Sequence, residues 1–342
     1  MPQTRSRRRV KKQASIFRRI YGGLVFVSAI IVGVYILWPM VIKPPAQQTE
    51  KPNSPAQSSG ASRPENPPEP QGPVRREQTY NILLVGVDDG HGNADTIMLL
   101  QYDIPNQKVG VVSIPRDTMV NRDWSSIPKI NAAYGKGGME LLREEISRTL
   151  GVPIDYHIRV GLQAFIEVVD QVGGLDFYVP EDMYHDDEGG FVINLKQGQQ
   201  WLSGRKTLEL VRYRGYGNAD IGRTEMQREV LTALAKKVLS FGNITNIQSF
   251  LKIFNDHVDT DLGWTDMVFL AQSALGLDTE TGVTTAVLPG RGDAVKGKTK
   301  WCYELDPVQT LEMVNDLLNP YDQPLTLADL DLIKGESYLQ DY

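Results

Sequence analysis

Short apolar runs alternate with longer amphipathic stretches from Tyr80 to about residue 320 of the chain. The runs NILLVGVD, DTIMLLQYDI and KVGVVSIP have the length and composition of buried strands. The stretches MELLREEISRTL and TEMQREVLTALAKKVLS repeat apolar residues at the spacing of a helix. The pattern predicts one α/β domain over residues 80–320, with a mixed central β-sheet flanked by helices.

The first 42 residues follow a different pattern, in which a basic segment precedes an uncharged apolar run. Residues 1–19 hold eight Lys and Arg residues and no acid, which predicts that they stay in the cytoplasm. Residues 20–42 are long enough as a helix to cross a hydrocarbon core of about 30 Å. We expect a single-pass cell-membrane protein whose remaining chain lies outside the cytoplasm. A cleaved signal peptide is the alternative, but its apolar core would be shorter.

Two further segments differ in composition from the predicted domain. Residues 43–79 are rich in Pro, Gln, Ser and Glu and nearly lack large apolar side chains, so they cannot bury enough surface to fold. We expect a disordered linker that holds the domain away from the membrane. Residues 321–342 are expected to form a short C-terminal tail.

Composition excludes several classes of protein. The chain of 342 residues is 41% hydrophobic and has one cysteine and four histidines, which argues against a disordered chain, a disulfide scaffold and a zinc finger. The net charge is −6, and because residues 1–19 contribute +8, the remainder sums to −14. We expect no nucleic-acid partner, because so acidic an outer part repels phosphate backbones.

The first three predicted strands place charged residues at one rim of the sheet. If residues 89–94 form a loop between antiparallel strands, Asp88 ends one strand opposite Asp95 at the start of the next. A third strand that returns through a turn at residues 106–107 then brings Arg116 beside Asp95. Two carboxylates and an arginine are therefore predicted to share this rim.

Two carboxylates this close repel each other unless a cation compensates them. A bound Mg²⁺ or Mn²⁺ would hold both Asp88 and Asp95 ionised and would leave positions for phosphate oxygens and water. The alternative is that both are turn residues at strand ends, where Asp is common.

A second group of arginines lies in the segment TLELVRYRGYGNADIGRTEMQRE. Arg212 and Arg214 project to one side if the chain is extended there, and Arg223 stands near a predicted helix start. Guanidinium groups and helix N-termini both bind phosphate, so the group is interpreted as a polyphosphate clamp. The alternative is a capping box formed by Thr224 and Gln227. In that alternative, the arginines form ordinary ion pairs with Asp220, Glu225 and Glu209.

These residues and four further motifs together resemble the LytR-CpsA-Psr family of cell-envelope proteins. The motifs are SIPRDT (113–118), KINAAYGKGG (129–138), GVPIDY (151–156) and DQVGGLDFYVP (170–180). The resemblance covers about residues 80–320 and includes the single anchor with a long linker. It implies an LCP-like fold and a phosphotransferase that moves an anionic glycan polymer from an undecaprenyl pyrophosphate carrier to peptidoglycan through a phosphodiester. It also implies an apolar channel for the prenyl tail.

The resemblance also implies roles for individual residues. Asp88 and Asp95 match the ligands of the divalent metal, and Asp220 matches an acidic position before the last arginine. The residues matching the pyrophosphate-binding set are Arg116, Arg212, Arg214, Arg223 and Gln227. Those expected to be catalytic are Asp95, Arg116, Asp220 and Arg223. Apart from the resemblance, we expect a carboxylate such as Asp95 or Asp117 to take the proton of the acceptor hydroxyl.

Two departures from the family pattern are visible. The stretch before Asp95 reads Asn93-Ala94, where an arginine is common, and Met226 stands where another arginine often precedes Gln227. An arginine is displaced to Arg228. The changes are compatible with a different polymer, with weaker binding, or with substitution by Arg228.

Two other functions share most of these features. A non-catalytic polyprenyl-phosphate-binding envelope regulator, or a transcription attenuator, would keep the arginines and the channel but show no turnover. A pyrophosphate hydrolase would act on the same lipid-linked substrate with water as the acceptor.

Overall fold

The structure is a computed structural model. It describes residues 43–48, 73–87, 94–186, 191–213, 215–216, 220–240 and 258–335. The chain divides into a larger unit of residues 46–262 and 271–342 and a smaller unit of residues 1–45 and 263–270. The expected membrane span over 20–42 lies outside the described residues. Within the described ranges, no helix is both long and apolar enough to cross a membrane.

A mixed sheet lies at the centre of the larger unit, with the strand order β10-β3-β2-β1-β4-β9. Its antiparallel meander is formed by β1 (Thr79–Val87), β2 (Ala94–Asp103) and β3 (Lys108–Ser113). Three further strands extend this meander on its two sides. On one side β10 (Val283–Val287) pairs in parallel with β3, and on the other β4 (Tyr156–Gly161) pairs in parallel with β1. The edge strand β9 (Val258–Thr260) pairs antiparallel with β4. The predicted α/β class with a mixed central sheet is confirmed, as is the turn between β2 and β3.

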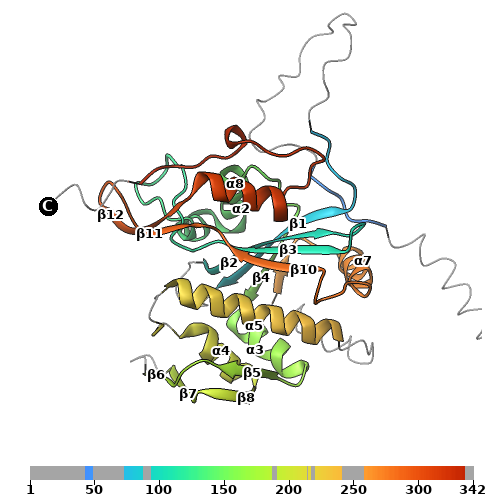
Figure 1. Cartoon of the computed structure of the whole chain (residues 1–342), viewed down its shortest axis with the longest axis vertical. Helices are drawn as coiled ribbons and strands as arrows, with labels where there is room; N and C mark the ends of the chain where they lie inside the picture. Colours follow the sequence, from blue (N-terminus) through green and yellow to red (C-terminus); the bar gives the residue numbers. More distant parts are fainter. Residues whose placement is uncertain are drawn as a thin grey trace, which may run out of the picture. The chain divides into compact units, whose positions relative to one another are not determined.

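Helices cover both faces of this sheet (Figure 1). On one face lie α2 (Asn131–Leu150) and α8 (Pro307–Leu317), and on the other lie α3 (Leu162–Gln171), α4 (Gly204–Arg212) and α5 (Asp220–Ser240). Gly110 in β3 allows the end of α8 to approach closely, because a Cβ there would collide with the Leu317 carbonyl. Within α2, Gly137 and Gly138 leave helical geometry, and Gly138 has a φ of +65°. The remaining helices are α7 (Trp264–Ala274) and the short 3₁₀ helix η2 (Leu327–Asp329).

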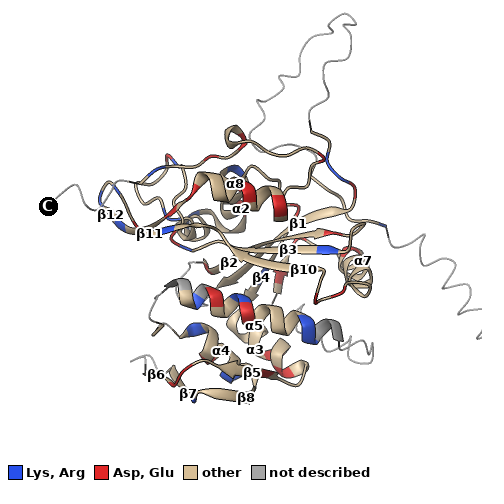
Figure 2. Cartoon of the chain, viewed as in Figure 1, with Lys and Arg blue, Asp and Glu red and all other residues tan. Residues whose placement is uncertain are grey.

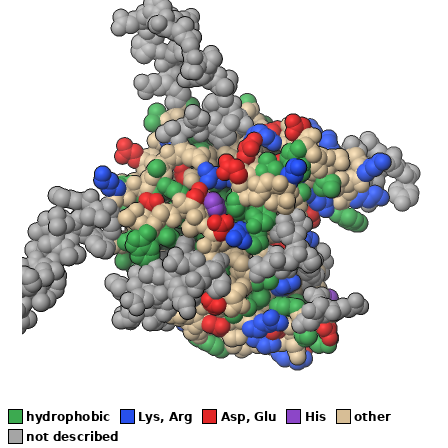
Figure 3. Space-filling view, turned by 180° about the vertical axis from the view of Figure 1, so that it is seen from behind, with side chains coloured by type: hydrophobic (Ala, Val, Ile, Leu, Met, Phe, Trp, Pro, Cys, Tyr) green, Lys and Arg blue, Asp and Glu red, His purple; other side chains and the backbone are tan. Residues whose placement is uncertain are grey.

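Three two-stranded sheets complete the described part of the larger unit. They are β5 (Leu175–Val179) with β8 (Gly198–Leu202), β6 (Met183–Asp186) with β7 (Val192–Leu195), and β11 (Gly290–Lys296) with β12 (Thr299–Leu305). Acidic and basic side chains are interspersed on the face shown in Figure 3.

Two apolar clusters form the core. The first joins the sheet to the α2 and α8 face through residues such as Leu99, Leu142 and Val314. The second joins α4 and α5 to the small sheets through residues such as Leu210 and Val230. The apolar positions of the strands and helices are thus buried in these two clusters. The first lies against one face of the sheet, and the second lies between α4, α5 and the small sheets.

Part of the expected linker over 43–79 is attached to the domain. The Gln48 N–H donates to Asp155 Oδ1 at 2.8 Å, and the Gln47 side-chain amide donates to the Thr79 carbonyl at 2.7 Å. The side chain of Asp155 is fully buried, and burial raises its pKa above the usual value despite the attraction of a neighbouring arginine. The segment 43–79 is therefore not disordered throughout. Residues near its start bond to residues near its end and to Asp155.

The expected tail over 321–342 also differs. Tyr321, Leu325 and Leu330 are buried, and Arg148 Nε on α2 donates to Asp331 Oδ2 at 3.0 Å. Apolar residues spaced along this segment thus pack on the domain as far as residue 335, and residues 336–342 lie outside the described ranges.

Tyr303 connects β12 to the core, because its hydroxyl donates a buried hydrogen bond to the Leu288 carbonyl at 2.8 Å. We expect Tyr303→Phe to lower the free energy of unfolding by about 1 kcal/mol, since the carbonyl is left buried without this donor. Urea unfolding followed by circular dichroism measures this. Tyr184→Phe is the control, because Tyr184 is 69% exposed, and an equal loss in both variants would contradict the prediction.

Candidate functional site

Asp95 lies at an irregularity where β2 begins. Gly86 of β1 faces Thr96, whereas Val87 faces Ala94, so Asp95 is the extra residue of a β-bulge. Bulges commonly redirect a side chain next to a functional site. The Asp95 side chain keeps 34% of its surface exposed. Asp88, predicted to stand opposite, lies outside the described residues.

The segment after β3 brings Arg116 to this carboxylate. The Ile114 N–H donates to the Ile97 carbonyl at 2.9 Å, which extends the β2–β3 pairing beyond Ser113. Arg116 Nη1 then donates to Asp95 Oδ1 at 3.0 Å. The predicted proximity of Arg116 and Asp95 is confirmed. With 24% of its side chain exposed, Arg116 is accessible to an anion from outside.

A second ion pair lies beside the first. Lys129 Nζ is 3.0 Å from Asp117 Oδ1, and Arg116 Nε is 4.0 Å from Asp117 Oδ2. The Asn131 N–H at the start of α2 donates to the Arg116 carbonyl at 3.1 Å. The start of α2 is therefore bonded to the backbone of Arg116. We name Asp95, Arg116, Asp117 and Lys129 the rim cluster.

Lys129 was not identified from the sequence. It opens the motif KINAAYGKGG, but its contact with Asp117 depends on how the loop between them folds. The Met119 N–H to Tyr303 carbonyl bond, at 2.8 Å, holds this loop against β12. No local spacing rule predicts such a contact.

A small apolar cavity lies within the first core, and two of its lining residues, Ile114 and Thr118, are two positions from Arg116 in the sequence. Its volume is about 10 Å³, which is space for about one water molecule. The lining residues are Ile114, Thr118, Val120, Ile130, Ile146, Thr149, Leu150 and Leu288. A longer apolar chain would fit into this cavity only if the surrounding side chains moved apart.

The second arginine group is divided between α4 and α5. Arg223 lies in the first turn of α5 and is only 3% exposed. Gln227 follows one turn later on the same helix face, and its amide donates to the Val211 carbonyl in α4 at 3.2 Å. The structure thus holds Arg223 and Gln227 on the α5 face that meets α4. Arg228 Nη1 instead donates to the Thr285 carbonyl of β10, at 3.4 Å.

The chain is helical at Arg212, so the extended geometry under which Arg212 and Arg214 would project to one side is not present there. Arg212 is the last residue of α4, which begins after Ser203, whose side chain accepts the Lys206 N–H. The guanidinium groups of Arg212 and Arg205 lie over the Phe191 ring, with Cζ to centroid distances of 4.4 and 4.1 Å. Such cation–π contacts orient Arg212. Arg214 and the side chain of Asp220 lie outside what the structure describes.

Other chemistry finds little support among the described residues. Within the described ranges, no three His, Cys, Asp or Glu side chains come together in a group suited to a metal ion. Cys302 is buried, and burial raises the pKa of its thiol, so the thiol is held in the protonated form that is a poor nucleophile.

Comparison with known proteins gives a family match. The model of the LytR_cpsA_psr family matches residues 46–317. TagU of Oceanobacillus iheyensis, a polyisoprenyl-teichoic acid–peptidoglycan teichoic acid transferase, is 33% identical over 233 residues, which cover 65% of this chain and 71% of TagU. TagV of Bacillus subtilis, with the same activity in its name, is 30% identical over 257 residues, which cover 72% of this chain and 65% of TagV.

Solved structures share the fold. The crystal structure of B. subtilis TagV has a TM-score of 0.61 at 28% identity and covers 69% of this chain and 94% of the TagV chain. The structure of TagT bound to LI-WTA has a TM-score of 0.59 at 25% identity and covers 70% of this chain and 90% of the TagT chain.

Proposed function

Because the chain belongs to the LytR-CpsA-Psr family, we propose that it is a phosphotransferase that moves an anionic glycan polymer from an undecaprenyl pyrophosphate carrier to peptidoglycan. The activities named for TagU and TagV support this proposal. The observation that carries it in this chain is the accessible Arg116–Asp95 pair at the rim of the sheet. We further propose that the enzyme is anchored in the cell membrane by residues 20–42, with the domain outside the cytoplasm.

In this proposal the rim cluster receives the diphosphate of the donor. The Arg116 guanidinium offers planar donors suited to phosphate oxygens, and its bond to Asp95 fixes the orientation of that plane. Lys129 adds positive potential beside it. These groups stabilise the charge that develops on the leaving polyprenyl phosphate, which is the main requirement of phosphoryl transfer. The prenyl tail would enter the apolar core at the cavity lined by Ile114 and Thr118.

The reaction needs no nucleotide. The oxygen of an acceptor hydroxyl on peptidoglycan attacks the phosphorus that carries the glycan, and the phosphoanhydride bond to the prenyl phosphate breaks. With Asp95 assigned to the metal, Asp117 is the rim carboxylate left to take the hydroxyl proton. The ion pair with Lys129 holds Asp117 in position.

The residues present are compatible with a divalent metal. Mg²⁺ and Mn²⁺ prefer carboxylate oxygens, and Mg²⁺ typically uses one or two carboxylates together with water and substrate phosphates. Asp95 is partly exposed at the rim, and Asp88 follows the end of β1 in the sequence, so these two would hold the ion. When bound, the metal would neutralise charge on the phosphate oxygens.

A transfer assay tests the proposal. The full chain in detergent is supplied with a lipid-linked donor labelled in the glycan, with peptidoglycan and with Mg²⁺. We expect the label on peptidoglycan together with an equal amount of released polyprenyl phosphate. Label released into solution would instead identify a hydrolase, and donor binding without any release would identify a non-catalytic binder.

Asp95→Asn tests the metal assignment. Because one of two carboxylate ligands is weakened, we expect the Mg²⁺ concentration for half-maximal transfer to rise by about tenfold. Asp259→Asn is the matched control, since Asp259 pairs with Arg159 at 3.1 Å as Asp95 pairs with Arg116 at 3.0 Å. Unchanged metal dependence in Asp95→Asn would remove the metal from the proposal.

A further inference from the structure

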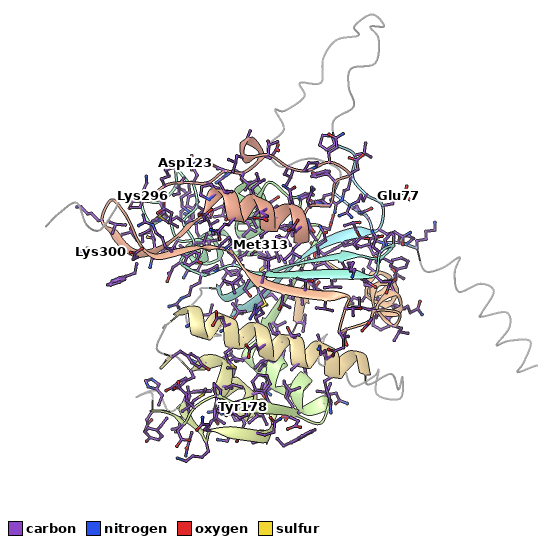
Figure 4. The ribbon with its side chains drawn as sticks, in the orientation of Figure 1. Glu77, Asp123, Tyr178, Lys296, Lys300 and Met313 are labelled. Carbon is purple, nitrogen blue, oxygen red and sulfur yellow. The ribbon has the colours of Figure 1, made fainter. Side chains whose placement is uncertain are left out.

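The β11–β12 hairpin carries a group of exposed lysines at its outer end. Lys296, Lys298 and Lys300 are exposed, and residues 294–303 include no Asp or Glu. Figure 2 shows basic residues along this hairpin, and Figure 4 shows Lys296 and Lys300 at the end away from the central sheet. Lys296 Nζ also donates to the Lys334 carbonyl at 3.3 Å. One sign of charge therefore dominates here, unlike the mixed face in Figure 3.

The acidic residues of the hairpin, Asp293 and Glu304, both lie beside Arg291. Glu304 Oε2 lies 2.6 Å from Arg291 Nη2, and Asp293 Oδ1 lies 3.8 Å from Arg291 Nη1. Residues 290–305 hold four Lys and Arg residues against these two acids, so the hairpin carries a formal charge of +2.

This hairpin begins at the rim cluster. The Tyr303 N–H donates to the Asp117 carbonyl at 2.8 Å, and Thr118 forms a parallel bridge with Tyr303. Lys300 precedes Tyr303 by three residues on β12, which is roughly 10 Å at the rise of a strand. A chain that leaves the rim cluster along the hairpin would meet the lysines one after another.

Trp301 adds an aromatic surface among these lysines. It is 65% exposed, and its φ of +58° is a backbone conformation that bulky residues rarely adopt. Ala294 pairs with Cys302 while Lys296 pairs with Thr299, so β12 carries an extra residue in this stretch. Uncommon backbone conformations persist where the surrounding structure imposes them, often at ligand sites.

We propose that the β11–β12 hairpin binds the anionic glycan polymer of the donor substrate as it extends from the pyrophosphate. The inference rests on the proposed function. Lysine ammonium groups suit a flexible row of repeating anionic groups, because each acts as a point charge without strict geometry. The exposed indole of Trp301 provides an apolar face against which sugar or glycerol carbons pack.

A membrane surface is the less favoured occupant. Interfacial insertion requires an apolar face with several large side chains. Among residues 290–305, all of which the structure describes, Trp301 is the one exposed large hydrophobic residue. The hairpin is therefore suited to a polar polyanion.

Binding of a soluble polyanion tests the proposal without turnover. The probe is poly(glycerol phosphate) added to the full chain in neutral detergent at low salt. We expect the combined change of Lys296, Lys298 and Lys300 to Gln to raise the Kd at least about tenfold and to flatten its salt dependence. The control changes three lysines elsewhere to Gln, namely the exposed Lys108 and Lys196 and the partly exposed Lys236. Equal effects of the two triple variants would overturn the proposal.

Trp301→Gly separates binding from folding. Glycine adopts a positive φ readily, so the variant keeps the hairpin without strain. We expect its Kd for a sugar-containing anionic polymer to rise by about threefold or more, because the variant lacks one aromatic contact. An unchanged Kd would remove Trp301 from the site.

Kinetics then connect the hairpin to the reaction. Two donors are compared, one with a long polymer and one trimmed to its linkage sugars. We expect the ratio of their kcat/KM values, long-chain over trimmed, to fall at least about tenfold in the lysine triple variant, because that variant binds the polymer more weakly. An unchanged ratio would overturn the inference while leaving the proposed function standing. If no variant turns over either donor but polymer binding still depends on the lysines, the proposed function fails and the hairpin site stands. Lysine-dependent association with phosphatidylglycerol vesicles, but not with the polymer, would assign the hairpin to the membrane and overturn the proposal.

Discussion

Arg116→Met is expected to lower the rate of polymer transfer by roughly 10²- to 10³-fold, the usual effect of removing one preorganised donor from a developing charge. Arg116 is the rim residue with a planar set of donors, and 24% of its side chain is exposed. The fold should survive, because Asp95 is one third exposed and water can solvate it after the loss of its partner. Single-turnover rates with a labelled lipid-linked donor measure the effect.

Arg159→Met is the matched control for this substitution. Arg159 has a similar exposure, 32%, and bonds to Asp259 at 3.1 Å. Its removal therefore takes away the same charge and a similar exposed ion pair as the removal of Arg116 does. Arg116→Lys should fall between the wild type and Arg116→Met, since it keeps the charge and loses the planar fork. Equal rates for the Arg116→Met and Arg159→Met variants would show that the rim cluster does not contact the reacting phosphates.

Glu145→Leu is expected to lower the free energy of unfolding by about 3–5 kcal/mol, because it leaves the Arg122 charge buried without its carboxylate. Both side chains are 1% exposed, with Arg122 Nη2 and Glu145 Oε2 separated by 2.5 Å. Burial raises the pKa of Glu145 and lowers that of Arg122, so each charge depends on the other. The Trp124 indole N–H also donates to Glu145, at 2.9 Å. Urea unfolding of the purified chain measures the loss.

The double variant distinguishes pairing from packing. Replacing Arg122 with Met together with Glu145→Leu removes both buried charges, and we expect it to recover most of the lost stability. Glu144→Leu serves as the neighbouring control, because Glu144 is 65% exposed and should change stability by no more than about 0.5 kcal/mol. A double variant as unstable as the single one would mean that the loss arises from packing rather than from the stranded charge.

The rim of the sheet was predictable because its determinants are local. Three consecutive strands joined by short connections fix their own register, and that register brought Arg116 to Asp95. The bulge at Asp95 was not predicted, since the residues NADT look the same in a regular strand start. The contact of Lys129 with Asp117 was missed because a loop, rather than a repeating pattern, decides it.

Other differences arise from contacts between distant parts of the chain. Composition marked residues 43–79 as unfolded, yet Gln48 bonds to Asp155, which follows it by more than a hundred residues. The C-terminal segment attaches through Arg148 and Asp331 in the same non-local way. At Arg212, an extended chain was the condition for Arg212 and Arg214 to project to one side, whereas the Ser203 cap starts a helix that continues to Arg212.

The most direct test of the account is an experimental structure of the full chain with undecaprenyl pyrophosphate. We expect phosphate oxygens within hydrogen-bonding distance of the Arg116 guanidinium, and a prenyl tail entering the core between Ile114 and Ile146. A diphosphate bound elsewhere on the domain, with the Arg116–Asp95 pair uninvolved and the core closed, would contradict it.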